Sequence, residues 1–318
     1  MLSWPDFKEK QIVLINSDQL KLLSLQNDNL LIKDEEWRTI NKLSVYKIFS
    51  IFVIWDFTIT SKLITKLLEF GISIQVLWYN LRPKFTIWNP LEGNFLLREK
   101  QYNFPYNLEY AKQLIFQKTN NQLKLLQKIR QKDNKLKADI KKIKELIQKI
   151  ESIDNFDSLR WIEGNIAKLY FQNYFKDYNR TSRSPRTKKD ITNLLMDMWY
   201  TYLFYFIEAN LNLYGFDIYK GVFHTQFFER KSLVCDLQEP FRPIIDRKIK
   251  NAYALKQIDE KDFKFKNWAY TLPFQNHSKY SALFLEELLE HKEAIFKYVR
   301  EFYLTMLKQE KVLPIFEI

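Results

Sequence analysis

The feature that most restricts the fold of this 318-residue chain is a change in the spacing of its apolar residues near residue 98. Before that point, short runs of β-branched and aromatic residues are bounded by polar turn residues, a pattern typical of strands. From Glu109 to Ile150, apolar residues instead recur every three or four positions, which predicts helices. Only five glycines and nine prolines interrupt the chain, so long regular elements should dominate. The sequence therefore predicts an α+β protein, in which an N-terminal β-rich domain precedes a mostly α-helical C-terminal domain.

We expect a β-rich domain at residues 1–90, a linker at 91–108 and a helical domain at 109–318. Strands are predicted by the apolar runs at 11–15, 21–25, 30–33, 45–55 and 72–78, with a hairpin turn at 27–29. Between the last two strands, residues 59–70 have helical spacing and stop at Gly71, a residue type common just past a helix end. Further helices are predicted in two pieces at 109–150, and at 159–178, 190–212, 237–256, 281–290 and 293–307.

The positive charge of the chain is concentrated in one segment. The whole protein has a formal net charge of +12 and a pI near 9.4. Residues 98–150 contain 14 Lys and Arg against 5 Asp and Glu, whereas residues 1–90 contain 11 against 9. A solvated helix face explains such lysines without any function, whereas cations that follow a phosphate backbone explain them by DNA binding. The overall charge favours a polyanionic partner, either nucleic acid or an anionic membrane.

The apolar segments do not favour a membrane protein. Segments such as Val45–Trp55 are too short and too interrupted by charge to span a bilayer. The N-terminus lacks the basic flank and apolar run of a signal peptide. Cys235 is the only cysteine, so the chain can form neither an intrachain disulfide nor a cysteine-rich zinc cluster. We therefore expect a protein of the reducing cytoplasm.

A basic segment at residues 179–189 separates two predicted helices. Its Ser, Thr and Pro content is typical of a loop. It contains no acidic residue, and its cations are Arg180, Arg183, Arg186, Lys188 and Lys189. We predict that this loop contacts DNA; the alternative is a surface loop without a ligand.

Glu163 lies in a largely apolar helical stretch, among Trp161, Ile162 and Ile166. A carboxylate in such surroundings needs a partner, because an unpaired buried charge is unstable. The partner is either an arginine of the core or a metal ion, and the residues alone leave both open.

A second stretch of chain combines His224, one of three histidines, with Asp236, Glu239 and Arg242. The two acids are spaced i,i+3, so they are expected to share a face at the start of a helix. Two carboxylates and an imidazole in oxygen-rich surroundings suit Mg²⁺ or Mn²⁺. The alternatives are a structural histidine and acids that stabilise a helix N-terminus. Arg242 is expected to pair with one of the acids or with a phosphate of DNA.

Three motifs now form a recognisable set: Glu-Gly-x-x-Ala-x-x-Tyr-Phe at 163–171, Gly-x-x-His at 221–224 and Asp-Leu-x-Glu-Pro-Phe-Arg-Pro at 236–243. In their order and spacing the chain resembles the CRISPR-associated spacer-acquisition integrases, the CRISPR-associated protein one family. The resemblance covers nearly the whole chain. One departure is Leu194, which follows Asn193 where many members have alanine. This substitution affects local packing more than the chemistry.

The resemblance implies a role for each part of the chain. The β-rich domain would serve dimerisation or assembly, and the helical domain would serve catalysis and DNA binding. By motif, the metal ligands fall on Glu163, His224 and Glu239, with Mg²⁺ or Mn²⁺ as the ion, and Asp236 is an accessory acid of the catalytic site.

The activity implied is that of a metal-dependent DNA endonuclease and integrase. Such an enzyme inserts short foreign double-stranded DNA fragments into a CRISPR array, by attack of a 3′-hydroxyl on a phosphodiester. The family works as homodimers, two of which flank a dimer of a small companion protein to form a heterohexamer. Two alternatives remain: a metal-dependent repair or junction nuclease without integrase activity, and a non-catalytic DNA-binding subunit whose acids are structural.

Overall fold

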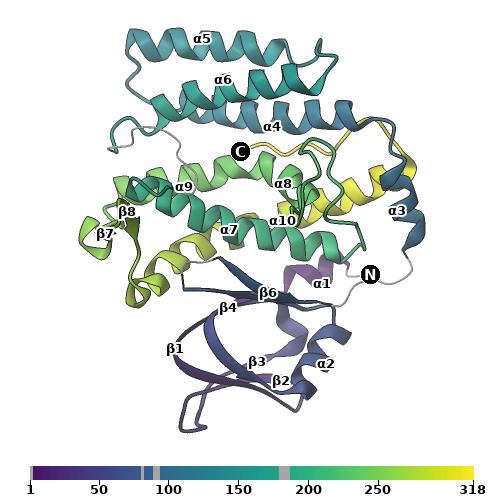
Figure 1. The fold of residues 1–318 in the computed structure, drawn as a ribbon, viewed down its shortest axis with the longest axis vertical. Coiled ribbons are helices and arrows are strands. Elements are labelled where there is room, and N and C mark those ends of the chain that lie inside the picture. The colour runs from purple at the N-terminus through teal and green to yellow at the C-terminus, as the bar shows by residue number, and fades with distance from the viewer. Residues whose placement is uncertain (1–2, 80–81, 89–93, 179–186) are drawn as a thin grey trace.

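The computed structural model describes residues 3–79, 82–88, 94–178 and 187–318. Its strands are β1 Gln11–Gln26, β2 Asn29–Lys33, β3 Thr39–Ser44, β4 Ile48–Ile59, β5 Ser73–Leu77, β6 Pro83–Ile87, β7 Lys264–Lys266 and β8 Ala269–Thr271. Its α-helices are α1 Trp4–Lys8, α2 Ser61–Glu69, α3 Phe95–Tyr102, α4 Asn107–Gln127, α5 Asn134–Gln148, α6 Phe156–Tyr174, α7 Ile191–Asn212, α8 Ser232–Gln238, α9 Arg242–Ala254 and α10 His277–Lys308. Short 3₁₀ segments are η1 Val45–Lys47, η2 Glu239–Phe241, η3 Glu260–Asp262 and η4 Phe274–Asn276. The predicted α+β class is confirmed, because the sheet is built by the first part of the chain and helices dominate the rest (Figure 1).

Among the described residues, a six-stranded sheet has the order β3-β2-β1-β4-β5-β6. β1 runs parallel to β4 and β4 runs parallel to β5, while the other neighbours are antiparallel. The predicted turn at 27–29 is confirmed by the hairpin between β1 and β2. Asn27 and Asp28 have φ values of 48° and 54°, the left-handed conformation that a tight hairpin turn requires.

Several strands differ from the prediction, including β7 and β8, which lie where no strand is predicted. The sequence predicts separate strands at 11–15 and 21–25, but β1 is continuous because β4 pairs with it on both sides of residues 18–20, with a register shift between Ser17 and Lys21. The edge strands β3 and β6 are missing from the prediction. Both are largely exposed or half-buried, so their sequences lack the apolar run of a central strand.

The sheet buries two faces against different partners. One face packs against Leu63 and Leu67 of α2. This helix ends before Gly71, whose φ of +66° confirms the predicted C-terminal glycine. On the opposite face, Phe52 of β4 makes edge contacts with Tyr202 and Tyr205 of α7. The sheet is therefore joined to the helices through an aromatic core.

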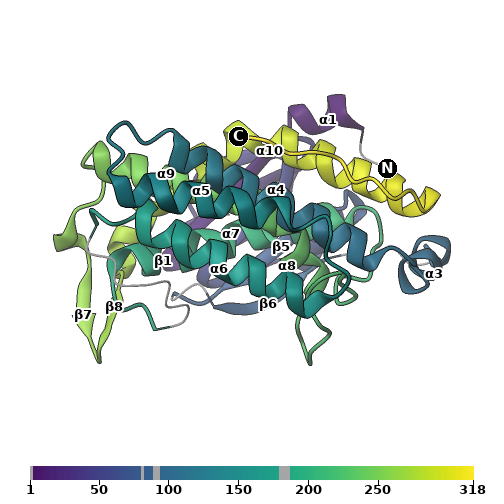
Figure 2. The same cartoon turned by 90° about the horizontal axis from the view of Figure 1, so that it is seen from above.

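Helices α4 to α10 form two tiers on one side of the sheet (Figure 1), and α4, α5 and α6 lie in front when the molecule is seen from above (Figure 2). The middle tier contains α7, α8, α9 and α10, and α4, α5 and α6 lie beyond it. Nearly all of α7 is buried, as expected for a helix that is apolar on every side. The two pieces predicted at 109–150 are confirmed as α4 and α5, and the helices predicted at 159–178 and 190–212 correspond to α6 and α7.

The C-terminal helices are divided differently from the prediction. The sequence predicts two helices at 281–290 and 293–307, but α10 runs through both. The intervening polar residues stay helical because His291 contacts Arg247, and Lys292 donates to backbone carbonyls near the N-terminus. Conversely, the helix predicted at 237–256 is broken into the end of α8, η2 and α9. Pro240 lies at this break, where it cannot supply the amide hydrogen that a continuous helix needs.

One core is shared by the two predicted domains. Phe7 stacks on Phe296 of α10 with ring centroids 4.1 Å apart. The segment 91–108, predicted as a linker, contains α3. The division at 1–90 and 109–318 remains a prediction. In the part of the chain that is described, none of the helices is long and apolar enough to cross a membrane.

Candidate functional site

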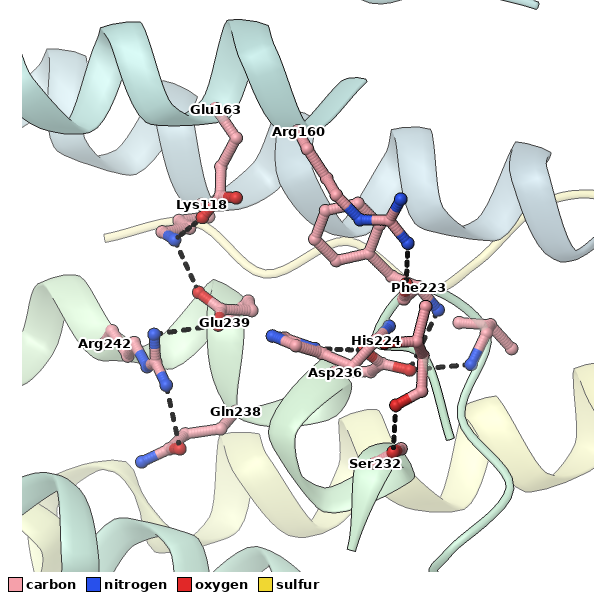
Figure 3. Close-up of polar contacts among 12 residues, drawn as sticks. Lys118, Arg160, Glu163, Phe223, His224, Ser232, Asp236, Gln238, Glu239 and Arg242 are labelled. Carbon is pink, nitrogen blue, oxygen red and sulfur yellow. Dashed lines mark hydrogen bonds and ion pairs between the residues drawn. The ribbon is translucent and has the colours of Figure 1, made fainter. Parts of the chain in front are cut away.

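Asp236 organises the loop that carries His224 (Figure 3). It is completely buried near the end of α8. Its Oδ2 accepts hydrogen bonds from the backbone N–H groups of Val222 (2.6 Å) and Phe223 (3.0 Å), and its Oδ1 accepts one from that of His224 (2.9 Å). The imidazole Nδ1 of His224 lies 2.5 Å from the same Oδ1. Three successive amides and one ring nitrogen thus satisfy a carboxylate that has no contact with solvent.

Gly221 precedes this loop because there is no room for a side chain. A Cβ at this position would lie 2.5 Å from Oδ2 of Asp236 and 2.8 Å from Cβ of Ser232. Ser232 in turn donates a hydrogen bond from its Oγ to the carbonyl of Thr225 at 3.2 Å. A larger residue at position 221 would therefore push Asp236 away from the backbone amides whose hydrogen bonds it accepts.

The contacts of Asp236 fix the tautomer of His224. Because three N–H groups already point at it, Asp236 acts as an acceptor, and the Nδ1 of His224 carries the hydrogen that bridges them. In the neutral ring, Nε2 then keeps its lone pair. A carboxylate behind the histidine is the usual support of an imidazole that binds a metal ion.

Glu163 and Glu239 face each other across the ammonium group of Lys118 (Figure 3). The Nζ of Lys118 lies 2.5 Å from Oε1 of Glu163 and 2.7 Å from Oε2 of Glu239. The other oxygen of Glu239, Oε1, lies 2.8 Å from NH1 of Arg242. The side chains of Lys118 and Glu239 are only 6% and 2% exposed. These charges therefore compensate one another away from water, as buried ions must.

Opposing effects act on the pKa values of this cluster. Burial raises the pKa of Glu239, but the charges of Arg242, Lys118 and His224 outweigh it and lower the pKa from 4.5 to about 2. Burial lowers the pKa of Lys118, but Glu163 and Glu239 together raise it above its ordinary value. The buried glutamate and lysine are therefore both charged at neutral pH.

A second buried carboxylate holds the helices behind the site. Asp246 of α9 accepts hydrogen bonds from the hydroxyls of Tyr170 on α6 (3.0 Å) and Tyr200 on α7 (2.6 Å). The carbonyl of Tyr200 also accepts a hydrogen bond from Nε2 of Gln238 at 2.6 Å. Because Gln238 immediately precedes Glu239, this contact fixes the backbone that presents the glutamate.

The structure brings Glu163 and Glu239 together at one cation and places His224 next to Glu239 (Figure 3). Within the described residues, His224 makes no hydrogen bond to either glutamate. The expectation that both acids lie at the start of one helix is wrong. Asp236 lies in the last turn of α8 and Glu239 begins η2. Asp236 therefore does not stabilise a helix N-terminus, and its role is to hold the histidine loop.

The partner of Glu163 is a lysine that the sequence analysis did not single out. Lys118 is one of the 14 basic residues between 98 and 150. It lies one turn after Leu114 and two turns before Leu125, on the buried side of α4. A lysine within an apolar stripe needs a carboxylate partner, so this spacing was the available signal.

The predicted DNA-contacting residues are only partly described. Those outside the described residues are Arg180, Arg183 and Arg186. The carbonyl of Lys188 accepts a hydrogen bond from the backbone N–H of Tyr270 at 2.8 Å, and Lys189 is exposed. Arg242 pairs with Glu239 and lies over the ring of Tyr200. Contact of this loop and of Arg242 with DNA remains a prediction.

Another group of possible metal ligands lies on α10. This group has three members, and one ligand atom of each lies within 4.8 Å of the others: Glu287, Glu290 and His291. However, NH2 of Arg247 lies 2.9 Å from Oε1 of Glu287 and 2.7 Å from Nε2 of His291. A guanidinium group thus already compensates the charge of Glu287. The ligand set implied by the sequence motifs, Glu163, His224 and Glu239, lies elsewhere and remains a prediction.

Two of the three predicted ligands converge around Lys118, because the carboxylates on α6 and η2 point at its ammonium group. His224 is the nitrogen donor of the predicted set, and its tautomer is fixed by Asp236. Among the described residues, these three do not form a group whose ligand atoms all lie within 4.8 Å of one another. Carboxylate oxygens with one imidazole suit Mg²⁺ or Mn²⁺.

Comparison with known proteins identifies the family of the chain. A family model described as CRISPR associated protein Cas1 matches residues 14–286. The chain belongs to this family. A CRISPR-associated endonuclease Cas1 of Thermodesulfovibrio yellowstonii is 32% identical over 223 residues, which cover 66% of this chain and 70% of the relative. Another from Archaeoglobus fulgidus is 26% identical over 296 residues, with 84% and 86% covered.

Several solved structures share the fold. A Cas1 protein from Thermotoga maritima has a TM-score of 0.81 at 18% identity, covering 94% of this chain and 98% of that one. A casposase bound to integration product has a TM-score of 0.78 at 21% identity, with 95% and 92% covered. A chain of a Cas6-RT-Cas1–Cas2 complex has a TM-score of 0.83 at 20% identity; 97% of this chain aligns with only 36% of that longer chain.

The two motif glycines should respond oppositely to alanine. Gly221→Ala should lower the free energy of unfolding by about 1–3 kcal/mol, because the new Cβ collides with Asp236. Gly164→Ala should raise it by about 0.5–1 kcal/mol, since this exposed helical position has nothing within 4 Å. Urea unfolding followed by circular dichroism measures both. Equal stability of Gly221→Ala and the wild type would show that the loop is not tightly packed against Asp236.

Glu239→Gln should destabilise the fold by about 3–5 kcal/mol at neutral pH, because it leaves Arg242 and Lys118 without their shared buried carboxylate. Since the folded pKa of Glu239 is lower than the unfolded one, this stabilisation is present above pH 4.5 and declines as the pH falls towards about 2. Urea unfolding of both proteins at several pH values measures the difference.

Glu317→Gln is the control for that variant. It removes an exposed ion pair with Lys124, which should contribute only about 0–1 kcal/mol. A loss in Glu239→Gln no larger than in this control would contradict the assigned role of the buried cluster.

Proposed function

We propose that this protein is a DNA integrase of CRISPR adaptation. It would join the 3′-hydroxyl of a short foreign DNA fragment to a CRISPR array by transesterification, and would cleave DNA when water replaces the hydroxyl. The observation that carries this proposal is the pair of carboxylates, Glu163 and Glu239, directed at one cation beside a histidine oriented by Asp236. The family and the names of its endonuclease relatives support it.

The proposed metal ligands are Glu163, Glu239 and Nε2 of His224, with Mg²⁺ or Mn²⁺ as the ion. When bound, the ion would polarise the attacked phosphate and stabilise negative charge on its oxygens. Arg242 keeps Glu239 ionised, and Asp236 keeps the histidine in one orientation. Positioning and electrostatics account for most of the catalysis of phosphoryl transfer, so these residues need to transfer few protons.

Exposed aromatic rings close in sequence to the proposed ligands suit the end of a DNA strand. Trp161, which lies two residues before Glu163, is 62% exposed. Phe227 and Phe228, which follow His224 by three and four residues, are 75% and 83% exposed. Such rings stack on unpaired bases without reading their sequence. The lysines of α5 and the basic loop at 179–189 would hold the duplex through its phosphates.

The assembly is also a proposal. One structural neighbour is named as a Cas6-RT-Cas1–Cas2 complex and another as a casposase bound to integration product. These names support a small companion protein and DNA as partners. We propose that the chain forms homodimers through its β-rich domain, and that two homodimers join a companion dimer in the cytoplasm as a heterohexamer.

Glu163→Gln and His224→Ala should each reduce strand transfer by at least about 100-fold, the loss typical of removing one electrostatic group from a site. In the absence of divalent metal, their affinity for DNA should be unchanged, because neither residue belongs to the basic surface. The measurement is transfer of a labelled short duplex into a plasmid that bears a CRISPR repeat, with the companion protein and Mn²⁺ or Mg²⁺. His291→Ala, in the α10 cluster, is the control histidine.

Each outcome of that assay separates the candidate functions. Label transfer that depends on a divalent metal, a free 3′-hydroxyl and Glu163 would establish the integrase. Metal-dependent nicking without label transfer would favour a repair or junction nuclease. DNA binding with no metal-dependent reaction would favour a non-catalytic subunit, and wild-type transfer by either variant would refute the assigned ligands.

Replacing the loop cations Arg180, Arg183 and Arg186 with Gln should weaken DNA binding and reduce its dependence on salt. If each contacts a phosphate, the slope of log affinity against log salt should fall by about 3. Fluorescence anisotropy of a labelled duplex at several salt concentrations measures it. An unchanged slope would exclude the loop from the interface.

A matched triple variant on α5, at Lys137, Lys141 and Lys144, tests the basic helix. All three lysines are exposed. A reduced slope of log affinity against log salt would indicate that these lysines contact DNA phosphates. An unchanged slope would indicate that this helix face only faces solvent.

A further inference from the structure

The ammonium group of Lys118 lies where an ion shared by Glu163 and Glu239 would have to lie. Its nitrogen is 2.5 Å from one carboxylate oxygen and 2.7 Å from the other. Hard divalent cations lie at about 2.0–2.6 Å from their oxygen ligands. A metal ion bound by both glutamates would therefore occupy nearly the same point as the nitrogen.

Lysine and metal ion cannot share this position. The side chain of Lys118 is 6% exposed and that of Glu239 is 2% exposed, so two neighbouring cations there would repel each other with little solvent screening. Arg242 does not compete, because it contacts the other oxygen of Glu239. The cluster thus has two cations: Arg242 lies outside the metal position, and Lys118 lies within it.

We propose that Lys118 is a tethered cation that holds the metal position until a divalent ion displaces it, and that the released ammonium then pairs with a phosphate of bound DNA. This rests on the proposed function, because it assumes that Glu163 and Glu239 are metal ligands. Lys118 is a positioning residue in this account. Since its ammonium finds a new partner only when DNA is present, metal binding and DNA binding favour each other, and the coupling is reciprocal.

The direct test compares how tightly three full-length proteins bind Mn²⁺: the wild type, Lys118→Met and Lys124→Met. Electron paramagnetic resonance measures the free Mn²⁺ in each titration. Methionine keeps the length of the side chain and removes its charge. Without DNA, the dissociation constant of Lys118→Met for Mn²⁺ should be at least about tenfold lower than that of the wild type, since the competitor is gone. Lys124 lies on the same helix in an exposed ion pair, so Lys124→Met should bind Mn²⁺ like the wild type.

Adding a short DNA duplex should tighten Mn²⁺ binding by the wild type several-fold and change that of Lys118→Met much less. An equal or weaker Mn²⁺ affinity of Lys118→Met without DNA would overturn the proposal. Mn²⁺ binding that is lost in Glu163→Gln but unaffected by Lys118→Met would overturn this inference alone and leave the proposed metal site intact. Absence of Mn²⁺ binding in every variant, with and without DNA, would overturn the metal site as well.

A second measurement uses only the wild type and so does not depend on the folding of the variant. An amine-reactive reagent, read by mass spectrometry, should label Lys118 weakly in the absence of metal, because its ammonium is buried and paired. Saturating Mn²⁺ should increase labelling of Lys118 several-fold and leave that of Lys124 unchanged. Unchanged labelling of Lys118 in Mn²⁺-bound protein would show that the lysine is not displaced.

Discussion

The buried carboxylate of Glu239 is the constraint on which the rest of the site depends. An ionised group that is 2% exposed is stable only when cations or hydrogen-bond donors compensate its charge, and for Glu239 cations do so. One of these, Arg242, comes from the next turn of the same segment. The other, Lys118, comes from α4, far away in the chain, so α4 must pack against η2 and α6. Neutralising one glutamate therefore dictates how three elements are arranged.

Asp236 solves the same problem in a different way. It is fully buried and satisfied by backbone amides rather than by lysine or arginine. Amides carry no side-chain entropy, and they come from successive residues, so the carboxylate determines the course of the loop as well as the orientation of His224. The absence of space at Gly221 is the steric consequence. A site that acts mainly by positioning benefits from such rigid support.

Local signals in the sequence were sufficient for much of the fold. The turn at Asn27 and Asp28, the glycine after α2 and the spacing in α4 and α5 all depend on neighbours in the chain. The errors occurred where distant partners decide. The two predicted strands join into β1 because β4 pairs with the chain on both sides of residues 18–20, and α10 continues through His291, which Arg247 contacts. In the candidate site, the motifs selected the acids and the histidine, and their roles remain a prediction.

Lys118 shows why the motifs could not complete the site. In a run of lysines, one buried ammonium differs from the solvated ones only by its position on the helix, and its partners come from two other elements. Its presence also explains how the site can be both buried and ready for DNA. Without metal, two carboxylates and two cations cancel, so the cluster is stable in a region of low exposure. If a divalent ion replaces the ammonium, positive charge appears there that a phosphodiester can neutralise. The site would then attract DNA when the ion is present. Without the ion, Lys118 and Arg242 would keep the two glutamates neutralised and paired.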